Sequence, residues 1–150
     1  MKVMPTLEGG LKIDVESEQD FRVLEMIVKD AGSPDEVTAD LAQLMQQQED
    51  WNELITPDLW EMVYGQFAIV AKAVSAAKVD NILHISSDSA DAWYGALNQA
   101  RLQLEREHGL HQWTEEEDGL SELLQNILIR DRFYCMLQTL LLDFVMGGDL

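Results

Sequence analysis

Two histidines and a glutamate form the group of side chains best suited to chemistry in this sequence. Glu105, His108 and His111 lie three residues apart along the chain, and imidazoles together with carboxylates bind divalent metals such as zinc. Gly109 follows His108 directly and is typical of a residue that ends a helix, so the two imidazoles are not held on one helical face. We therefore expect no metal site, and we interpret His108 as a favourable charge at a helix C-terminus.

A second candidate site lies on the same predicted helix, at Arg101 and Asn98. At about 100° per residue from Trp93, Arg101 lies roughly 80° from the centre of the apolar stripe and Asn98 roughly 140°. An arginine at the edge of a buried face either pairs with a carboxylate or binds an anion, because its guanidinium suits both. In so acidic a chain we favour the ion pair.

Tryptophan is the remaining residue type whose position points to a contact surface. Trp51, Trp60 and Trp93 fall on helical stripes of apolar residues and are therefore expected in the core. Trp113 instead lies between two predicted helices, just before the acidic run Glu115-Glu116-Glu117-Asp118. We expect its indole to be exposed, and an exposed tryptophan with an acidic rim fits the anchor of a protein–protein contact.

Motifs of the common catalytic and cofactor-binding sites are absent from the sequence. It contains no G-x-G-x-x-G, P-loop, H-E-x-x-H, G-x-S-x-G, C-x-x-C or EF-hand pattern. We therefore assign no cofactor and no catalytic residue. Cys135 is the single cysteine, so an intramolecular disulfide is excluded. Because it lies between the apolar residues Phe133 and Leu137, we expect it to be buried and unreactive.

The charge of the chain narrows the classes of partner. It has 28 Asp and Glu residues against 10 Lys and Arg, which gives a formal net charge of −18. Such a charge repels phosphate backbones and anionic lipid headgroups, so we expect neither nucleic acid nor a membrane as partner. A basic protein surface would be attracted, and solubility alone would also explain the charge. A mimic of DNA would need its carboxylates on one face, whereas here they occur in every segment.

The periodicity of apolar residues predicts a mainly α fold, an approximately five-helix bundle. Gly32 and Gly109 mark helix ends, while Ser17 and Thr56 precede helices as N-caps, the latter followed by Pro57 at the first helical position. The expected helices cover about residues 18–31, 37–55, 57–79, 88–108 and 120–146. Two short extended segments, near residues 11–15 and 82–85, could pair as a small two-stranded sheet. We expect residues 1–150 to form a single helical domain.

The last predicted helix is apolar on nearly all sides from Phe133 to Met146. A helix without a polar face is buried, either at the centre of its own fold or at a contact between subunits. We therefore expect a homodimer that uses this C-terminal helix. With Gln138 and Asp143 inside it, the stretch is too short and too polar to span a bilayer. The N-terminus also lacks the apolar region of a signal peptide, so we expect a cytoplasmic protein.

Two blocks of the sequence resemble a family of uncharacterised bacterial domains. The first block is Leu11-Lys12-Ile13-Asp14-Val15 with a following Phe21-x-x-Leu24, and the second is Trp93-x-x-x-Leu97-Asn98-x-x-Arg101-Leu102. Genes of that family are often found beside the gene of the ClpS protease adaptor. The resemblance implies a small helical cytoplasmic protein without established chemistry.

The function expected from these observations is a protein–protein interaction or regulatory module with an acidic surface and no catalysis. Trp113 is its first candidate contact residue, followed by Arg101, Asn98 and His108. The alternative is a small-molecule-binding protein, or an enzyme of unrecognised type, with a pocket near Arg101 and His108. A buried polar pocket would favour the alternative, whereas a surface with an exposed apolar patch would favour the first hypothesis.

Overall fold

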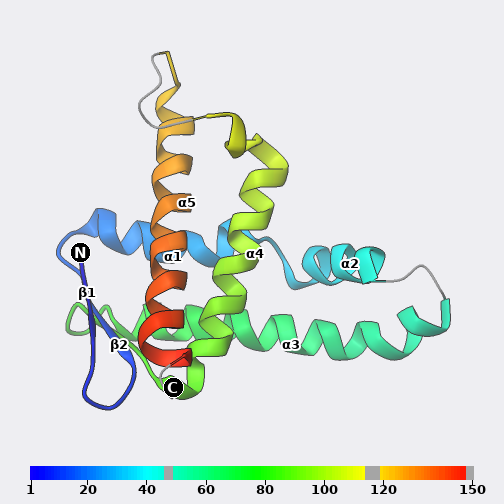
Figure 1. Cartoon of the computed structure of the whole chain (residues 1–150), viewed down its shortest axis with the longest axis horizontal. Helices are drawn as coiled ribbons and strands as arrows, with labels where there is room; N and C mark the ends of the chain where they lie inside the picture. The colour runs from blue at the N-terminus through cyan, green and yellow to red at the C-terminus, as the bar shows by residue number, and fades with distance from the viewer. Residues whose placement is uncertain (46–48, 114–118, 148–150) are drawn as a thin grey trace.

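A computed structural model places helices over most of the part of the chain that it describes, which is residues 1–45, 49–113 and 119–147, with side chains described outside residues 40–56 (Figure 1). The helices of this part are α1 (Glu18–Ala31), α2 (Pro34–Met45), α3 (Glu49–Ala76), α4 (Ala90–His108) and α5 (Glu122–Leu141), and the strands are β1 (Lys2–Pro5), β2 (Leu11–Asp14) and β3 (Ile82–Ile85). Short turns of 3₁₀-helix, η1 (Ser87–Ser89) and η2 (Leu110–Gln112), flank α4, and a π-helical turn, η3 (Leu142–Met146), extends α5. The predicted mainly α fold with five helices is confirmed.

The expected pairing of the two extended segments is also confirmed. β2 and β3 are antiparallel, with Leu11 opposite Ile85 and Ile13 opposite Leu83, and all four side chains are buried. Side chains two residues apart on a strand point to the same face, so these four form one apolar surface against the helices. The sheet supplies part of the single cluster of buried apolar residues that forms the core.

The sheet has a third strand that the sequence analysis did not predict. β1 pairs antiparallel with β2, with Val3 opposite Ile13, and β2 is therefore the central strand. The turn that joins them depends on Gly10, because a Cβ at this position would lie 2.2 Å from the carbonyl oxygen of Ile85. The alternation in Lys2-Val3-Met4 before the Gly-Gly pair was the available signal for this hairpin.

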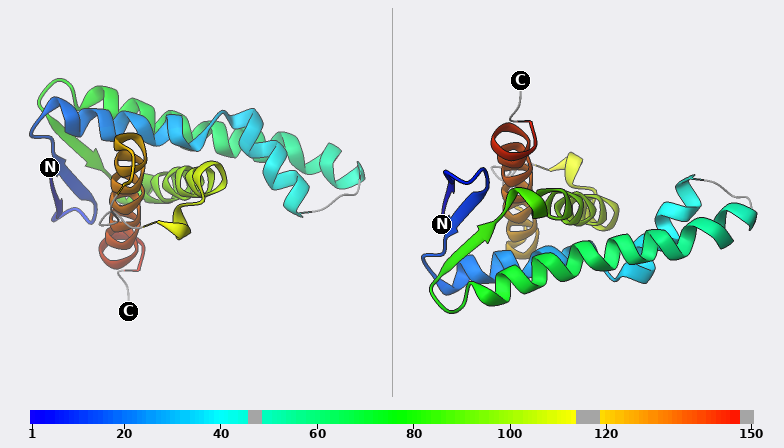
Figure 2. Two further views of the ribbon diagram at one scale, coloured as in Figure 1. Left: turned by 90° about the horizontal axis from the view of Figure 1, so that it is seen from above. Right: turned by 90° about the horizontal axis from the view of Figure 1, so that it is seen from below.

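α4 lies at the centre of the helices. It packs against α1, α3 and α5, and its residues Trp93, Leu97 and Ala100 have no exposed surface. Figure 2 shows α1 and α3 side by side, with α4 and α5 crossing them on one side and the sheet at one end. The burial of Trp93 confirms its assignment to the core.

Helix ends follow the predicted capping residues in most places. The Ser17 side chain accepts a hydrogen bond from the Asp20 backbone N–H at 3.2 Å, as an N-cap does. Gly32 ends α1 and Gly109 ends α4, both with a positive φ that a residue with a Cβ rarely adopts. These helix boundaries are therefore fixed by local chemistry and could be found from the sequence.

The predicted helix break at Thr56-Pro57 is wrong. α2 ends at Met45 and α3 begins at Glu49, so Pro57 lies inside α3. Proline has no N–H to donate to the carbonyl four residues earlier, and its ring crowds the preceding turn. α3 continues because α2 packs along it and Trp60 Nε1 donates to Asp35 Oδ1 of α2 at 2.8 Å. Tertiary contacts here outweigh the local preference of proline.

Three burial predictions also need correction. Trp60 is 38% exposed instead of buried in the core, because α2 covers only one edge of its ring. Cys135 is half-buried. α5 is buried on one face, at Tyr134, Leu137 and Leu141, where it packs against α4 and bonds to Asp30 of α1, so it is not buried on all sides within its own fold; the alternative, a contact between subunits, stays a prediction. The opposite face, with Met136 for example, is exposed.

Some predictions fall outside the described residues. These are the acidic run at residues 115–118, expected beside Trp113, and the side chain of Trp51, expected in the core. Among the helices of the described ranges, none is long and apolar enough to cross a membrane.

Candidate functional site

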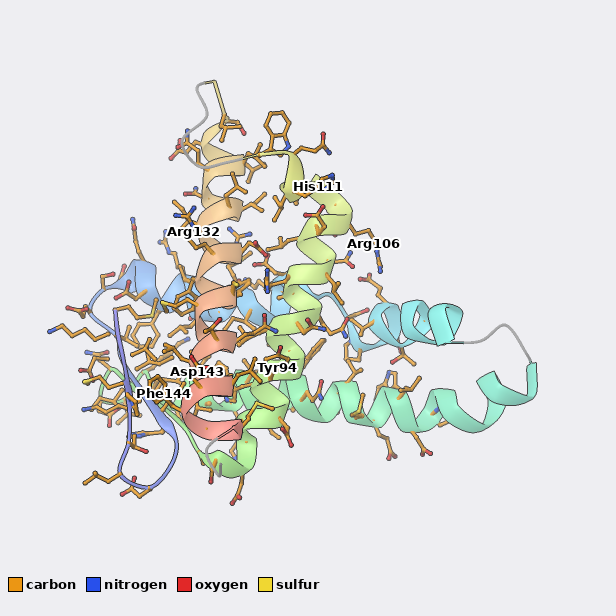
Figure 3. The ribbon with its side chains drawn as sticks, viewed as in Figure 1. Tyr94, Arg106, His111, Arg132, Asp143 and Phe144 are labelled. Atoms are coloured by element: carbon orange, nitrogen blue, oxygen red, sulfur yellow. The ribbon has the colours of Figure 1, made fainter. Side chains whose placement is uncertain are left out.

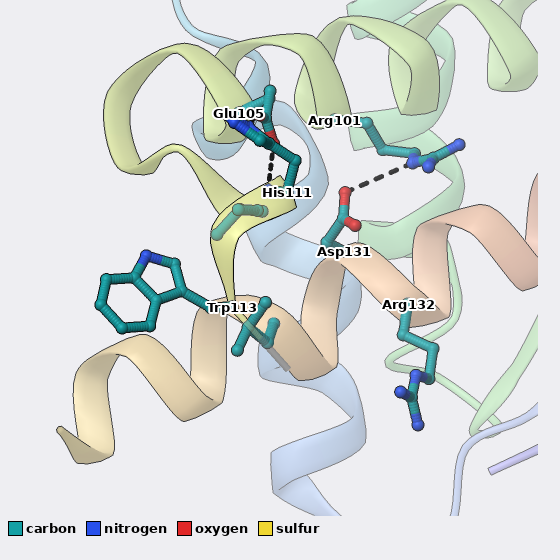
Figure 4. A pocket seen from close by; sticks show the side chains of 8 residues that line it. Arg101, Glu105, His111, Trp113, Asp131 and Arg132 are labelled. Atoms are coloured by element: carbon teal, nitrogen blue, oxygen red, sulfur yellow. Dashed lines mark hydrogen bonds and ion pairs between the residues drawn. The ribbon is translucent and has the colours of Figure 1, made fainter. Parts of the chain in front are cut away.

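A surface pocket lies where the C-terminal half of α4, the turn η2 and the middle of α5 meet. Its volume is about 360 Å³. Figure 4 shows the polar side chains of α4 and η2 facing those of α5 across it. The lining residues are Arg101, Glu105, Leu110, His111, Trp113, Leu128, Asp131 and Arg132. Gly109 makes this arrangement, because its left-handed backbone reverses the chain after α4 and returns His111 toward Glu105.

Arg101 links α4 to α5. Its Nε lies 3.3 Å from Asp131 Oδ1, and its Nη1 donates to Gln138 Oε1 at 2.9 Å. The buried Gln138 amide in turn donates to the backbone carbonyl of Tyr94 on α4 at 3.5 Å. The expectation that Arg101 pairs with a carboxylate is therefore confirmed. These bonds use two of the five N–H donors of the guanidinium, one on Nε and one on Nη1.

Glu105 and His111 form a second polar pair at the pocket. One carboxylate oxygen accepts the His111 backbone N–H at 3.0 Å, and the other contacts the Nδ1 of the same residue. The hydrogen bond from the His111 side chain lowers the pKa of Glu105. The imidazole is 73% exposed, so water surrounds most of this pair.

The structure brings together only part of the predicted set of contact residues. Arg101 and Trp113 both line the pocket, and Trp113 is 40% exposed. His108 is half-buried beside Glu107, at 3.7 Å, and does not line the pocket, and Asn98 is exposed on α4 away from it. His111 takes the place expected for His108, because η2 turns it back over α4.

The described residues that line the pocket carry charges of both signs. Arg101 and Arg132 are balanced by Glu105 and Asp131, in a chain whose net charge is −18. Among the lining residues that the structure describes, none is a serine, threonine or cysteine, the residues that most often act as nucleophiles in covalent catalysis. Within the described ranges, no three His, Cys, Asp or Glu side chains gather as a metal site would require.

A buried ion pair away from the pocket was missed by the sequence analysis. Asp30 of α1 accepts hydrogen bonds from Arg130 Nε at 2.8 Å, Arg130 Nη2 at 3.0 Å and the Tyr134 hydroxyl at 2.6 Å. Asp30 is 8% exposed and Tyr134 is fully buried. Burial, together with the charge of Asp30, raises the pKa of Tyr134 well above its usual range, so the phenol remains protonated.

A signal for this ion pair was present in the sequence. Asp30 follows Leu24 and Ile27 at helical spacing, which places a carboxylate on the buried stripe of α1. A buried carboxylate needs a cation or several donors. Its partner could not be identified from the sequence, because Arg130 lies 100 residues away along the chain.

The structure is that of a mainly helical protein with a small antiparallel sheet and a surface pocket lined by side chains of both charges. The family model described as Domain of unknown function (DUF2017) matches residues 5–144. The chain therefore belongs to this family, which confirms the resemblance to an uncharacterised domain family. No curated protein and no solved structure matches the chain.

Proposed function

We propose that this protein works by binding other proteins and catalyses no reaction. One observation carries the proposal, an apolar stripe on the outer face of α5. Ile129, Phe133, Met136 and Leu140 follow one another at steps of four, three and four residues, which places them on one side of the helix. Ile129 is 50% exposed and Met136 42% exposed, while Phe133 and Leu140 are half-buried and pack partly against the core.

The stripe continues into η3 with Phe144, four residues after Leu140. Phe144 is 51% exposed, and Figure 3 shows it at the end of the helix that lies away from His111 and the pocket. An exposed apolar surface that runs along a helix is typical of a contact with another protein chain.

A second copy of this chain is the partner that we propose for the stripe. Most of the surface of a chain with a net charge of −18 repels another copy. On α5, between Glu122 and Asp143, the exposed side chains are uncharged apart from Arg132. Two such stripes therefore meet without bringing many like charges together, and the homodimer would form through the C-terminal helix.

Light scattering over a range of protein concentrations tests this proposal. Ile129→Glu would place a charge in the apolar contact, and we expect it to weaken self-association by about a hundredfold or more. Ile69→Glu is the matched control, because Ile69 is a similarly exposed side chain of α3, at 42%. A monomer mass at every concentration, or equal effects of the two substitutions, would contradict the dimer.

The pocket at Arg101 supports a second candidate function, the binding of a small molecule. Its volume of about 360 Å³ lies at the lower end of the range for ligand sites. Native mass spectrometry of the purified protein would detect a bound metabolite. A metabolite that is lost on Arg101→Ala, while the melting temperature is kept, would favour this second function over protein binding.

Three further expectations belong to this proposal. The resemblance to domains encoded beside the ClpS protease adaptor leads us to propose the same gene neighbourhood for this chain, and ClpS is therefore one protein to test as a partner. We also propose a cytoplasmic location, which cell fractionation would test.

Trp113 is exposed at the rim of the pocket. Replacing it by alanine should weaken a contact with another protein without lowering the melting temperature.

A further inference from the structure

A second exposed apolar surface lies on α3 and begins in the part of the molecule that projects furthest. α2 and the N-terminal half of α3 extend together beyond α4 (Figures 1 and 2). From this projecting part into the C-terminal half of α3, one face of the helix is uncharged and exposed. We name it the α3 row, and it consists of Pro57, Trp60, Tyr64, Ala68 and Ala71. Their spacing of three or four residues places them along one side of the helix.

Two aromatic rings form the outer end of the α3 row. Trp60 and Tyr64 are stacked, with ring centroids 5.0 Å apart and an angle of 11° between the planes. The hydrogen bond from Trp60 Nε1 to Asp35 Oδ1, at 2.8 Å, holds the indole in place. The side chains nevertheless remain 38% and 54% exposed. Aromatic side chains fixed in this way and open to water contribute strongly to binding energy when a partner covers them.

The charge of the same segment decides which partner fits. Residues 30–71 contain no lysine, arginine or histidine, and Lys72, just beyond Ala71, is the first cation after Lys29. Eight carboxylates lie between Pro34 and Glu61: Asp35, Glu36, Asp40, Glu49, Asp50, Glu53, Asp58 and Glu61. Of these, Asp35, Glu36, Asp58 and Glu61 are described in the structure and are exposed.

We propose that the α3 row binds a basic polypeptide segment of another protein, an inference that rests on the proposed protein-binding function and assigns it a surface. An arginine or lysine of the partner would lie over the exposed ring faces, because the π-electrons of tryptophan and tyrosine attract cations. The carboxylates of Asp35 and Glu61 would pair with neighbouring cations, and the small side chains of Ala68 and Ala71 would admit a close backbone.

The charge also argues against the other occupants of this surface. A nucleic acid or an anionic membrane would be repelled by the carboxylates around the row. A second copy of the chain would bring two segments without a cation face to face, at a cost in like-charge repulsion. Arg106 of α4 lies on the side of α2 (Figure 3), but it belongs to another element and leaves the row itself uncharged.

Titration calorimetry with a defined probe tests the inference. The probe is a synthetic helical peptide of leucine, alanine and arginine, and the control peptide has glutamate in place of each arginine. We expect the arginine peptide to bind at low ionic strength and to weaken as salt screens the charges, and the glutamate peptide not to bind. No measurable binding of the arginine peptide at low salt would overturn the inference.

Substitutions in the row locate the contact. Tyr64→Ala and Trp60→Ala should each lower the affinity by about tenfold, whereas Tyr64→Phe, which keeps the ring, should change it little. Tyr64 is more than half exposed, so its variants are expected to fold, and circular dichroism checks this. An affinity that Tyr64→Ala leaves unchanged would overturn the inference.

Paired charge changes separate a local effect from the net charge. Asp58→Asn with Glu61→Gln removes two charges beside the row, and Asp88→Asn with Glu8→Gln removes two exposed charges elsewhere. The first pair should weaken peptide binding several-fold more than the second, since its carboxylates lie next to the bound cations. Equal effects would mean attraction to net charge alone and would overturn the inference.

Failure of this inference differs from failure of the proposed function. Ile129→Glu should abolish self-association and leave peptide binding unchanged, because α5 and the α3 row are separate surfaces. If no substitution in the α3 row changes the affinity for the peptide, the inference is contradicted, and the proposed dimer through α5 is not affected. A chain that stays monomeric yet binds the peptide through Trp60 and Tyr64 contradicts the dimer alone.

Discussion

At the scale of single residues, the buried carboxylate of Asp30 is the polar group with the most complete set of partners described above. Asp30 receives three hydrogen bonds, two from Arg130 and one from the Tyr134 hydroxyl. A carboxylate with these three donors, and only 8% exposed, has little capacity left for a substrate. Its contribution is to join α1 to α5, and through them the two ends of the chain.

Asp30→Ala tests this structural role. The substitution leaves the guanidinium of Arg130 without its carboxylate, and removal of one partner of a buried ion pair costs about 3–5 kcal/mol. Asp131→Ala is the matched control, because its partner Arg101 is more exposed and keeps a hydrogen bond to Gln138, so a loss of about 1 kcal/mol is expected. Urea unfolding measures both free energies of unfolding. Similar losses for the two variants would contradict the role assigned to Asp30.

At the scale of helices and strands, the sequence predicted those features that local chemistry determines. Ser17, Gly32 and Gly109 each act within a few residues, so their positions as helix caps could be read directly. The pairing of β2 with β3 followed from two similar apolar alternations. The prediction at Pro57 was wrong because packing of α2 against α3 outweighs the preference of proline for a helix start. This packing depends on the fold and cannot be found from the residues around Pro57.

The candidate site could be predicted only in part for the same reason. Arg101 was expected to pair with a carboxylate, but the identity of Asp131 depends on how α4 crosses α5, which spacing does not determine. His111 lines the pocket in place of the predicted His108, because η2 folds the chain back after Gly109. The exposure of α5 likewise depends on how many neighbours the fold supplies, and α1 and α4 cover one face.

Pro57→Ala tests the continuity of α3. If the helix runs through residue 57, alanine restores the missing N–H and removes the crowding of the ring, and we expect a gain of about 1–3 kcal/mol in the free energy of unfolding. Pro34→Ala is the control, because Pro34 is the first residue of α2, where proline is well tolerated. Thermal and urea unfolding of both variants give the comparison. A loss of stability in Pro57→Ala would show that the helix starts there after all.

At the scale of the whole molecule, the positive charges are distributed unevenly along the chain, which a count of carboxylates alone does not show. Acidic residues occur in every segment, whereas the cations are missing from residues 30–71. The projecting part of α2 and α3 therefore has carboxylates and no cation of its own, while the described lining of the pocket on α4 and α5 carries both signs of charge and α5 presents an uncharged stripe. These three regions suit different contacts: a basic segment, a small ligand and a second copy.

The dependence of stability on salt provides a test of this uneven charge. Like charges on a compact surface repel one another and destabilise the folded state, and raising the ionic strength from about 0.01 M to about 0.1 M shortens the screening length from about 30 Å to about 10 Å. The melting temperature of the protein should therefore rise with salt. Asp58→Asn with Glu61→Gln removes repulsion within residues 30–71, which contain no cation, so at low salt this variant should be more stable than the parent by about 1 kcal/mol, which raises the melting temperature by roughly 2–4 °C. Asp88→Asn with Glu8→Gln should shift the melting temperature less, and the difference between the two variants should shrink at high salt. Equal shifts of the melting temperature for both pairs at every salt concentration would mean that negative charge has the same effect everywhere on the surface. The surroundings of the α3 row would then not differ electrostatically from the rest of the surface.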